Sequence, residues 1–369
     1  MAFLTNGSIG RRVMVLAVIL IVQFALLEAG LRLYGAFEGS STFQSLFMDD
    51  PRVGIRLRPN THVRYSTVEF TADIDINAQG VRDDEPIGAK APNERRIVVL
   101  GDSLVLSVQV SLAETFCKKL ERQLNARGGS VHWRVINGGV QGYGPVEEWM
   151  FFDHVVAAFD PDLVLIVAFV GNDAIDAAGM SASFEAGRPI AATQPGVRWF
   201  RRVVRSSVVL QSVRVRWDQL RSKIVLGTPE APLASYLTTP PPVVADGLTI
   251  SRRAFGRIAE RAAGFGARTA IALMPARFQV NDTDFGNLQQ IVREAGGELD
   301  RQAASGRFMD ALAPLGLPIV DLQPALFAQP NRQGIFFQRT VHLTPRGHDV
   351  VARALEEFLR TSGLVPAGQ

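Results

Sequence analysis

Residues 95–104 read RRIVVLGDSL, a short apolar run that ends in a glycine, an aspartate and a serine. Arg96–Leu100 is almost entirely apolar, as expected for a strand covered on both faces of a sheet. Four later runs have the same character: Val131–Ile136, Leu163–Val170, Thr269–Met274 and Leu317–Val320. Helical patterns separate or follow them: Ala113–Asn125, Glu147–Phe159, Arg252–Gly264, Leu288–Ala304 and Pro345–Leu359. This alternation predicts an α/β fold, with a parallel sheet of about five strands and helices on both faces.

The composition fits a folded protein and excludes several classes. Of 369 residues, 47% are hydrophobic and 20% charged, which is enough apolar side chain to form a core. The 39 basic and 36 acidic residues give a net charge of +3, too small an excess to indicate a nucleic-acid partner. Cys117 is the single cysteine, so an internal disulfide is excluded, and no Cys/His cluster has the spacing of a zinc site.

The amino terminus predicts a membrane segment. Residues 13–27 read VMVLAVILIVQFALL, and the 23 residues 13–35 would form a helix about 34 Å long. A hydrocarbon layer is about 30 Å thick. Arg11 and Arg12 precede the run, which predicts that residues 1–12 are cytoplasmic and the body of the protein is extracytoplasmic. We favour an uncleaved single-pass anchor; a cleaved signal peptide and a buried helix are the alternatives.

The remaining chain divides into a linker and one large domain. Residues 36–94 are predicted to be a juxtamembrane linker with a small β element, because Phe70, Ala72, Ile74 and Ile76 alternate with polar residues. The main domain is expected over residues 95–362, with an insertion at 175–250 and a tail at 363–369. Within the insertion, residues 197–226 combine basic residues with apolar ones at helical spacing. This pattern fits a helix on anionic lipid, a lid over the site, or a surface helix docked on the core.

Polar or glycine-rich residues follow the first three predicted strands or precede the last helix. Gly101-Asp102-Ser103 follows the first strand, residues 137–144 (NGGVQGYG) follow the second, and Gly171-Asn172-Asp173 follows the third. His342 lies just before the last helix, whose start is marked by Thr344 and Pro345. Because the carboxyl ends of parallel strands share one edge of a sheet, these four signatures are expected to meet.

Together the four signatures resemble the GDSL/SGNH hydrolase superfamily over about residues 95–359, in the form of a membrane-anchored bacterial-type member. The resemblance implies a three-layer, flavodoxin-like domain that uses no cofactor and no metal. It assigns Ser103 as the nucleophile and His342 as its general base. It also assigns the oxyanion hole to the backbone N–H groups of Ser103 and Gly142 and the side chain of Asn172. Asp102 is expected to have a structural role in its loop.

One position departs from that family pattern. The family usually carries an aspartate three, sometimes two, residues before the histidine, where this chain has Arg339 and Thr340. Three explanations are open. A backbone carbonyl orients the ring and leaves a Ser103–His342 dyad, or Asp321 at the end of the fifth strand acts as a distant acid, or the site is catalytically weak. A cation at Arg339 would also disfavour the imidazolium.

The sequence thus predicts a serine hydrolase that cleaves O-acyl esters through an acyl-enzyme, held in the cell membrane by residues 13–35 with its domain on the periplasmic side. The alternatives are an O-acyltransferase that modifies a cell-envelope polysaccharide, which the resemblance permits, and a weakly active scaffold of the same fold. The expected partners are an acylated substrate, such as an envelope carbohydrate, and the membrane. The acyl group, the alcohol and any protein partner are not specified.

Overall fold

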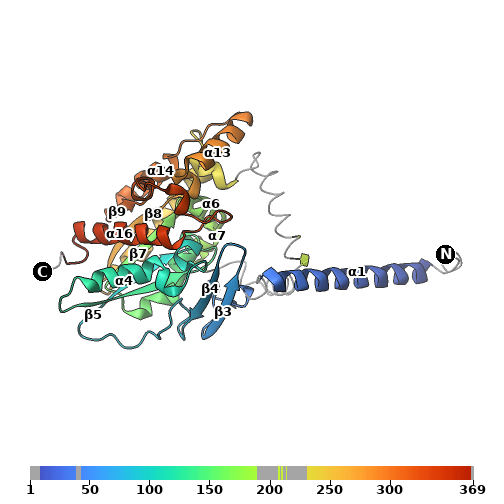
Figure 1. Ribbon diagram of the computed structural model, residues 1–369, viewed down its shortest axis with the longest axis horizontal. Coiled ribbons are helices and arrows are strands. Elements are labelled where there is room, and N and C mark those ends of the chain that lie inside the picture. Colours follow the sequence, from blue (N-terminus) through green and yellow to red (C-terminus); the bar gives the residue numbers. More distant parts are fainter. Residues whose placement is uncertain are drawn as a thin grey trace.

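The computed structural model describes residues 9–38, 43–188, 207, 209–210, 213 and 231–366 (Figure 1). Its centre is a five-stranded sheet in the order β6-β5-β7-β8-β9, with every neighbouring pair parallel. The strands are β5 (Glu94–Gly101), β6 (His132–Gly139), β7 (Leu163–Phe169), β8 (Arg268–Met274) and β9 (Ile319–Asp321). Relative to chain order this is the 2-1-3-4-5 arrangement of flavodoxin-like folds. The predicted fold class is confirmed.

The middle parts of the strands are apolar because the sheet is covered on both faces. In β5, Val98 and Leu100 belong to one buried cluster, while Ile97 and Val99 belong to the other. Helices α5 (Pro145–His154) and α11 (Pro242–Ala263) cover the first face, and α4 (Phe116–Ala126) and α16 (Pro345–Thr361) cover the second. The other α-helices described in the domain are α3 (Ser103–Leu106), α6 (Asp173–Gly179), α7 (Ser181–Ala186), α12 (Arg277–Val280), α13 (Asp282–Glu294), α14 (Ala303–Leu312) and α15 (Gln323–Phe327).

One predicted helix is wrong and another is longer than expected. The pattern over Leu288–Ala304 is split between α13 and α14. The break falls at Gly296, which adopts φ +83°, a left-handed conformation that ends a helix and favours glycine. Helix α11 begins at Pro242 rather than near Arg252, so the chain returns to the core before the end of the predicted insertion. Most of residues 197–226 lie outside the described residues.

The amino-terminal helix α1 (Ile9–Glu38) projects away from the domain (Figure 1). Its segment Gly10–Leu33, 24 residues, is long and apolar enough to cross a membrane, and none of it is buried against the protein. An amino-terminal signal sequence would have the same properties. Glu28 pairs with Arg32 at 2.8 Å and accepts hydrogen bonds from Ser207 Oγ at 2.7 Å and the Val209 N–H at 3.1 Å.

Residues 43–94 form two antiparallel hairpins that pack into the domain core. The first pairs β1 (Phe47–Asp50) with β2 (Gly54–Leu57), and the second pairs β3 (Thr61–Ser66) with β4 (Thr71–Ile76). The predicted strand at residues 70–76 is therefore confirmed. Arg82 is fully buried, and its guanidinium donates to the carbonyls of Leu106, Ser107 and Val110 around the end of α3. The segment thus braces the helix that begins with Ser103.

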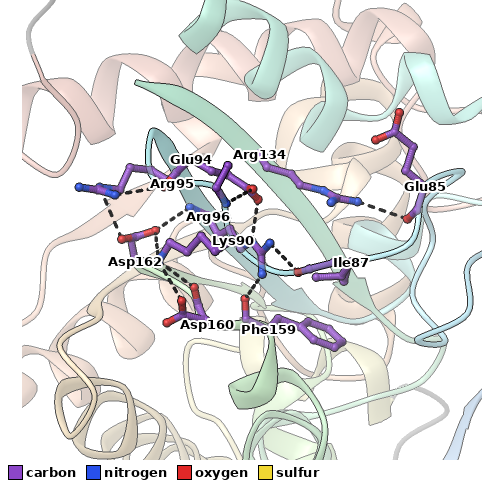
Figure 2. A network of polar contacts seen from close by, with 12 residues as sticks. Glu85, Ile87, Lys90, Glu94, Arg95, Arg96, Arg134, Phe159, Asp160 and Asp162 are labelled. Atoms are coloured by element: carbon purple, nitrogen blue, oxygen red, sulfur yellow. Dashed lines mark hydrogen bonds and ion pairs between the residues drawn. The ribbon is translucent and has the colours of Figure 1, made fainter. Parts of the chain in front are cut away.

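A polar network closes the sheet at the amino ends of its strands (Figure 2). Buried Arg96 bonds Glu94 at 2.6 Å and the Phe159 carbonyl at 2.8 Å. Asp162 accepts from the Arg96 N–H at 2.8 Å and pairs with Lys90 at 2.8 Å. These charged groups pair with one another. They lie at the amino ends of the strands, whereas the predicted site residues follow the carboxyl ends.

Candidate active site

The structure brings Ser103 and His342 together, although they lie 239 positions apart in the chain. Ser103 begins α3 directly after β5, and His342 lies in the loop that precedes α16. The His342 Nε2 atom is 2.9 Å from Ser103 Oγ, within hydrogen-bond distance. The serine side chain is nearly buried, and the contact places an imidazole where it can take the hydroxyl proton.

The environment of His342 favours the neutral ring. Burial lowers the pKa of His342 to about 4, because the imidazolium form loses its hydration. The only cause of this shift is burial, so the anticipated effect of the Arg339 charge is not what lowers it. At neutral pH the ring therefore carries no charge and its Nε2 atom can accept a proton from Ser103.

The other ring nitrogen of His342 is not held by any described residue. Nδ1 of His342 is enclosed and makes no hydrogen bond within the described part of the chain. Asp321 instead accepts from the Gln323 N–H at 2.9 Å, so the structure does not bring it to the imidazole. Among the described residues no backbone carbonyl bonds Nδ1 either. Of the three explanations for the missing acid, the structure supports neither the carbonyl-oriented dyad nor Asp321, and a catalytically weak site stays a prediction.

The loop that carries His342 is instead held through its backbone. The carboxylate of Glu69, at the turn between β3 and β4, accepts from the N–H of Gln338 at 2.8 Å and of Arg339 at 3.0 and 2.9 Å. From the other side, Arg277 donates to the carbonyls of Phe337, at 3.2 Å, and Gln338. Glu69 thus fixes the peptide groups at the position where the family usually has its aspartate.

Sequence reasoning missed Glu69, and no local signal could have found it. The residue precedes the predicted strand at residues 70–76 and lies 269 positions before Gln338. Only the packing of the β3–β4 hairpin on the domain brings the two together. The rings of Phe70 and Phe337, 5.5 Å apart, belong to the same contact.

Replacing Glu69 with glutamine should lower kcat for ester cleavage by about threefold to tenfold with little change in KM. Hydrogen bonds to a charged group contribute about 1.5–3 kcal/mol, and a neutral amide keeps part of that acceptor capacity. Glu298→Gln, at an exposed glutamate, is the matched control. Steady-state kinetics and a melting curve check the result. Equal kcat for Glu69→Gln and wild type would show that the clamp does not position His342.

Asn172 lies between β7 and α6, at the same edge of the sheet. Its amide nitrogen donates to Asp176 at 2.6 Å, which orients the side chain. An amide NH₂ has two donors, so one N–H is left for an oxyanion. Burial raises the pKa of Asp176 to about 6. The role of Asn172 as an oxyanion donor stays a prediction.

Gly142 lies in the turn after β6 and has φ +73°, a conformation that favours glycine. A Cβ atom there would meet nothing within 4 Å, so the backbone angle and not crowding calls for glycine. The glycine that packs tightly on the nucleophile helix is Gly139, where a Cβ would lie 2.3 Å from the Leu106 nitrogen. The donor role of Gly142 also stays a prediction.

Several acidic side chains are buried behind Ser103. Asp102 caps α3 by accepting from the Leu104 N–H at 2.8 Å, in the structural role expected of it, and burial raises its pKa to about 7. Burial also raises the pKa of Glu148 and Asp173 well above the usual range. The raised pKa favours the uncharged carboxyl, which opposes a developing oxyanion less than a carboxylate would. Among the described residues no group of three His, Cys, Asp or Glu could hold a metal ion.

A cavity of about 600 Å³ adjoins the site. Its lining includes Asn172 and Val341, the residue before His342. The remaining wall includes six further apolar side chains: Phe169, Leu233, Tyr236, Ala276, Phe278 and Leu288. Cavities of roughly 300–1,000 Å³ are typical of sites for small organic ligands.

Comparison with known proteins connects this site to a family. Residues 236–369, which include His342, match the model of the ALGX family, described as an SGNH hydrolase-like domain, acetyltransferase AlgX. No curated protein matches the chain. Among solved structures, TesA shares 12% identity over 72% of this chain and 99% of its own, with a TM-score of 0.42.

Two further solved structures are similar at the same level. A lipase/acylhydrolase from Enterococcus faecalis shares 13% identity over 73% of this chain and 96% of its own, with a TM-score of 0.40. A variant of Axe2, an acetyl xylan esterase from Geobacillus stearothermophilus, shares 13% over 72% and 94%, with a TM-score of 0.42. Identities and TM-scores this low carry no argument about activity.

Proposed function

We propose that this chain, which carries the SGNH hydrolase-like domain of the GDSL/SGNH superfamily, cleaves O-acyl esters through a covalent acyl-enzyme. The observation that carries the proposal is the 2.9 Å contact between Ser103 Oγ and His342 Nε2. A serine hydroxyl is a weak nucleophile that requires an adjacent base, and His342 is uncharged at neutral pH because burial lowers its pKa.

The reaction follows from the positions of these groups. Ser103 Oγ attacks the ester carbonyl carbon while His342 Nε2 takes the hydroxyl proton. The N–H groups of Ser103 and Gly142 and the free amide N–H of Asn172 bind the oxyanion, and losing one such donor typically lowers the rate about 10²–10³-fold. His342 then gives its proton to the departing alcohol. A second hydroxyl compound, activated by the same ring, attacks the acyl-enzyme and frees Ser103.

Water and a sugar hydroxyl are both possible as the second nucleophile. We place hydrolysis first, and O-acyl transfer to an envelope carbohydrate second because the matching family model is described as an acetyltransferase. Incubating the protein with an acylated donor, with and without a carbohydrate acceptor, separates them. Free acid in both samples supports hydrolysis, whereas acylated carbohydrate formed at the expense of free acid supports transfer.

A fluorophosphonate probe tests the proposal directly, because it reacts with an activated serine and requires no knowledge of the substrate. The full-length protein in detergent should be labelled, and the modified peptide should contain Ser103. An unlabelled wild-type protein, with folding verified by circular dichroism, would contradict the proposal and favour a non-catalytic scaffold of this fold.

We place the domain on the periplasmic side of the cell membrane, anchored by residues 13–35. Arg11 and Arg12 before the apolar helix support this orientation, because basic residues favour the cytoplasmic side. The chain should stay in the membrane fraction after an alkaline wash, and protease added to spheroplasts should digest its domain. A soluble, shortened protein in the periplasm would indicate a cleaved signal peptide instead.

The pH dependence of kcat/KM should show an acid limb well below pH 6. His342 acts as a base only when neutral, so activity is lost as pH falls through its pKa, which burial lowers to about 4. A histidine with the usual pKa of 6.5 would be about 90% charged at pH 5.5 and would have lost most activity there. A pH–rate profile with a neutral ester checks this, and a limb between pH 6 and 7 would contradict it.

A further inference from the structure

The cavity lined by Asn172 and Val341 is larger than a short acyl group requires. A water molecule occupies about 30 Å³ in the liquid, so a two-carbon acyl group would fill only a small part of the roughly 600 Å³ available. The cavity therefore has room for a substantial non-reacting portion of the substrate. Its chemistry depends on the few charged residues in its wall.

Three charged residues line the cavity: Arg277, Asp284 and Arg339. Two of them neutralise each other, because Arg277 Nε lies 2.8 Å from the Asp284 carboxylate. The Arg339 guanidinium makes no hydrogen bond or ion pair with any described residue, although its backbone N–H is bound to Glu69. Within the described residues, the wall thus carries one solvent-exposed positive charge that has no direct partner.

The backbone that carries that charge is held in the His342 loop. Arg339 lies three residues before His342, and Glu69 holds its peptide nitrogen in place. No ion pair joins the carboxylate of Glu69 to the guanidinium among the described residues, since Glu69 binds the backbone of this loop. Arginine presents paired N–H donors that match the two oxygens of a carboxylate.

We propose that the cavity binds an ester that carries a carboxylate, with Arg339 as the residue that recognises it. The inference rests on the proposed ester chemistry and names its substrate class. The carboxylate belongs to either the acyl or the alcohol portion of the ester. In both cases the ester carbonyl lies at Ser103 while the acidic end pairs with Arg339.

Two pairs of matched esters test the proposal on the full-length protein. Mono-4-nitrophenyl glutarate against 4-nitrophenyl valerate places the carboxylate on the acyl side. 4-Acetoxybenzoate against its methyl ester places it on the alcohol side. Wild type should prefer the acidic member of one pair by about tenfold in kcat/KM, which corresponds to about 1.4 kcal/mol. Arg339→Gln should remove the preference through KM, and Arg339→Glu should reverse it.

The control is Arg122→Gln, at an exposed arginine on α4, which should keep the wild-type preference. The subsite is overturned if wild type shows no preference in either pair, or if the preference survives in Arg339→Gln. Calorimetric binding of each ester to Ser103→Ala separates this result from the chemistry. Suppose that the acidic ester binds more tightly, that this depends on Arg339, and that wild type does not turn it over. That result would contradict the proposed function but retain the subsite.

Discussion

Replacing Ser103 with alanine should lower kcat for ester hydrolysis by at least about 10⁴-fold and abolish fluorophosphonate labelling. The hydroxyl that forms the acyl-enzyme is then absent, and only oxyanion donors and substrate binding remain to act on a water molecule. Because Ser103 is small and its Oγ contacts His342 rather than the core, the melting temperature should change little. Initial rates, probe labelling and a melting curve measure the three effects.

Ser111→Ala is the matched control, since Ser111 is exposed and its side chain makes no capping hydrogen bond. It should keep wild-type rates and labelling. Retention of more than about a tenth of the activity in Ser103→Ala would show that another group is the nucleophile. Loss of activity in both variants would point to damage of the fold and not to loss of a nucleophile.

Replacing His342 with glutamine should lower kcat by about 10³–10⁴-fold. Glutamine keeps a polar side chain in the loop but cannot accept the Ser103 proton. The Ser103→Ala/His342→Gln double variant should be about as inactive as either single variant, because residues that act as a unit show strongly non-additive effects. Rates for the three variants, measured at one pH, test this pattern.

His132→Gln, at an exposed histidine in β6, is the control and should remain active. Multiplicative losses in the double variant would mean that Ser103 and His342 act independently, against the proposed proton transfer. A His342→Gln variant that labels as fast as wild type would show that this histidine does not activate the serine.

The buried strands were predictable because each contains a continuous run of apolar residues. Runs such as Leu163–Phe169 are apolar at every position, which is stable only in a strand covered on both faces. Helix α16 was predictable from its start, where the Thr344 hydroxyl accepts from the Gly347 N–H at 3.2 Å. The break between α13 and α14 was missed because apolar spacing continues across Gly296, and backbone conformation ended the helix there.

Local sequence patterns were enough to predict the parallel sheet and the order of the signatures at its edge. Local hydrophobic patterning is enough for that, since each strand or helix is encoded by neighbouring residues. The surroundings of His342 depend on how distant segments of the chain pack together. The enclosed Nδ1, which no described residue binds, the Glu69 clamp and the place of Arg339 in the cavity wall arise from segments that are distant in the chain. Spacing along a sequence does not encode such distances, because they depend on how hairpins, loops and helices pack.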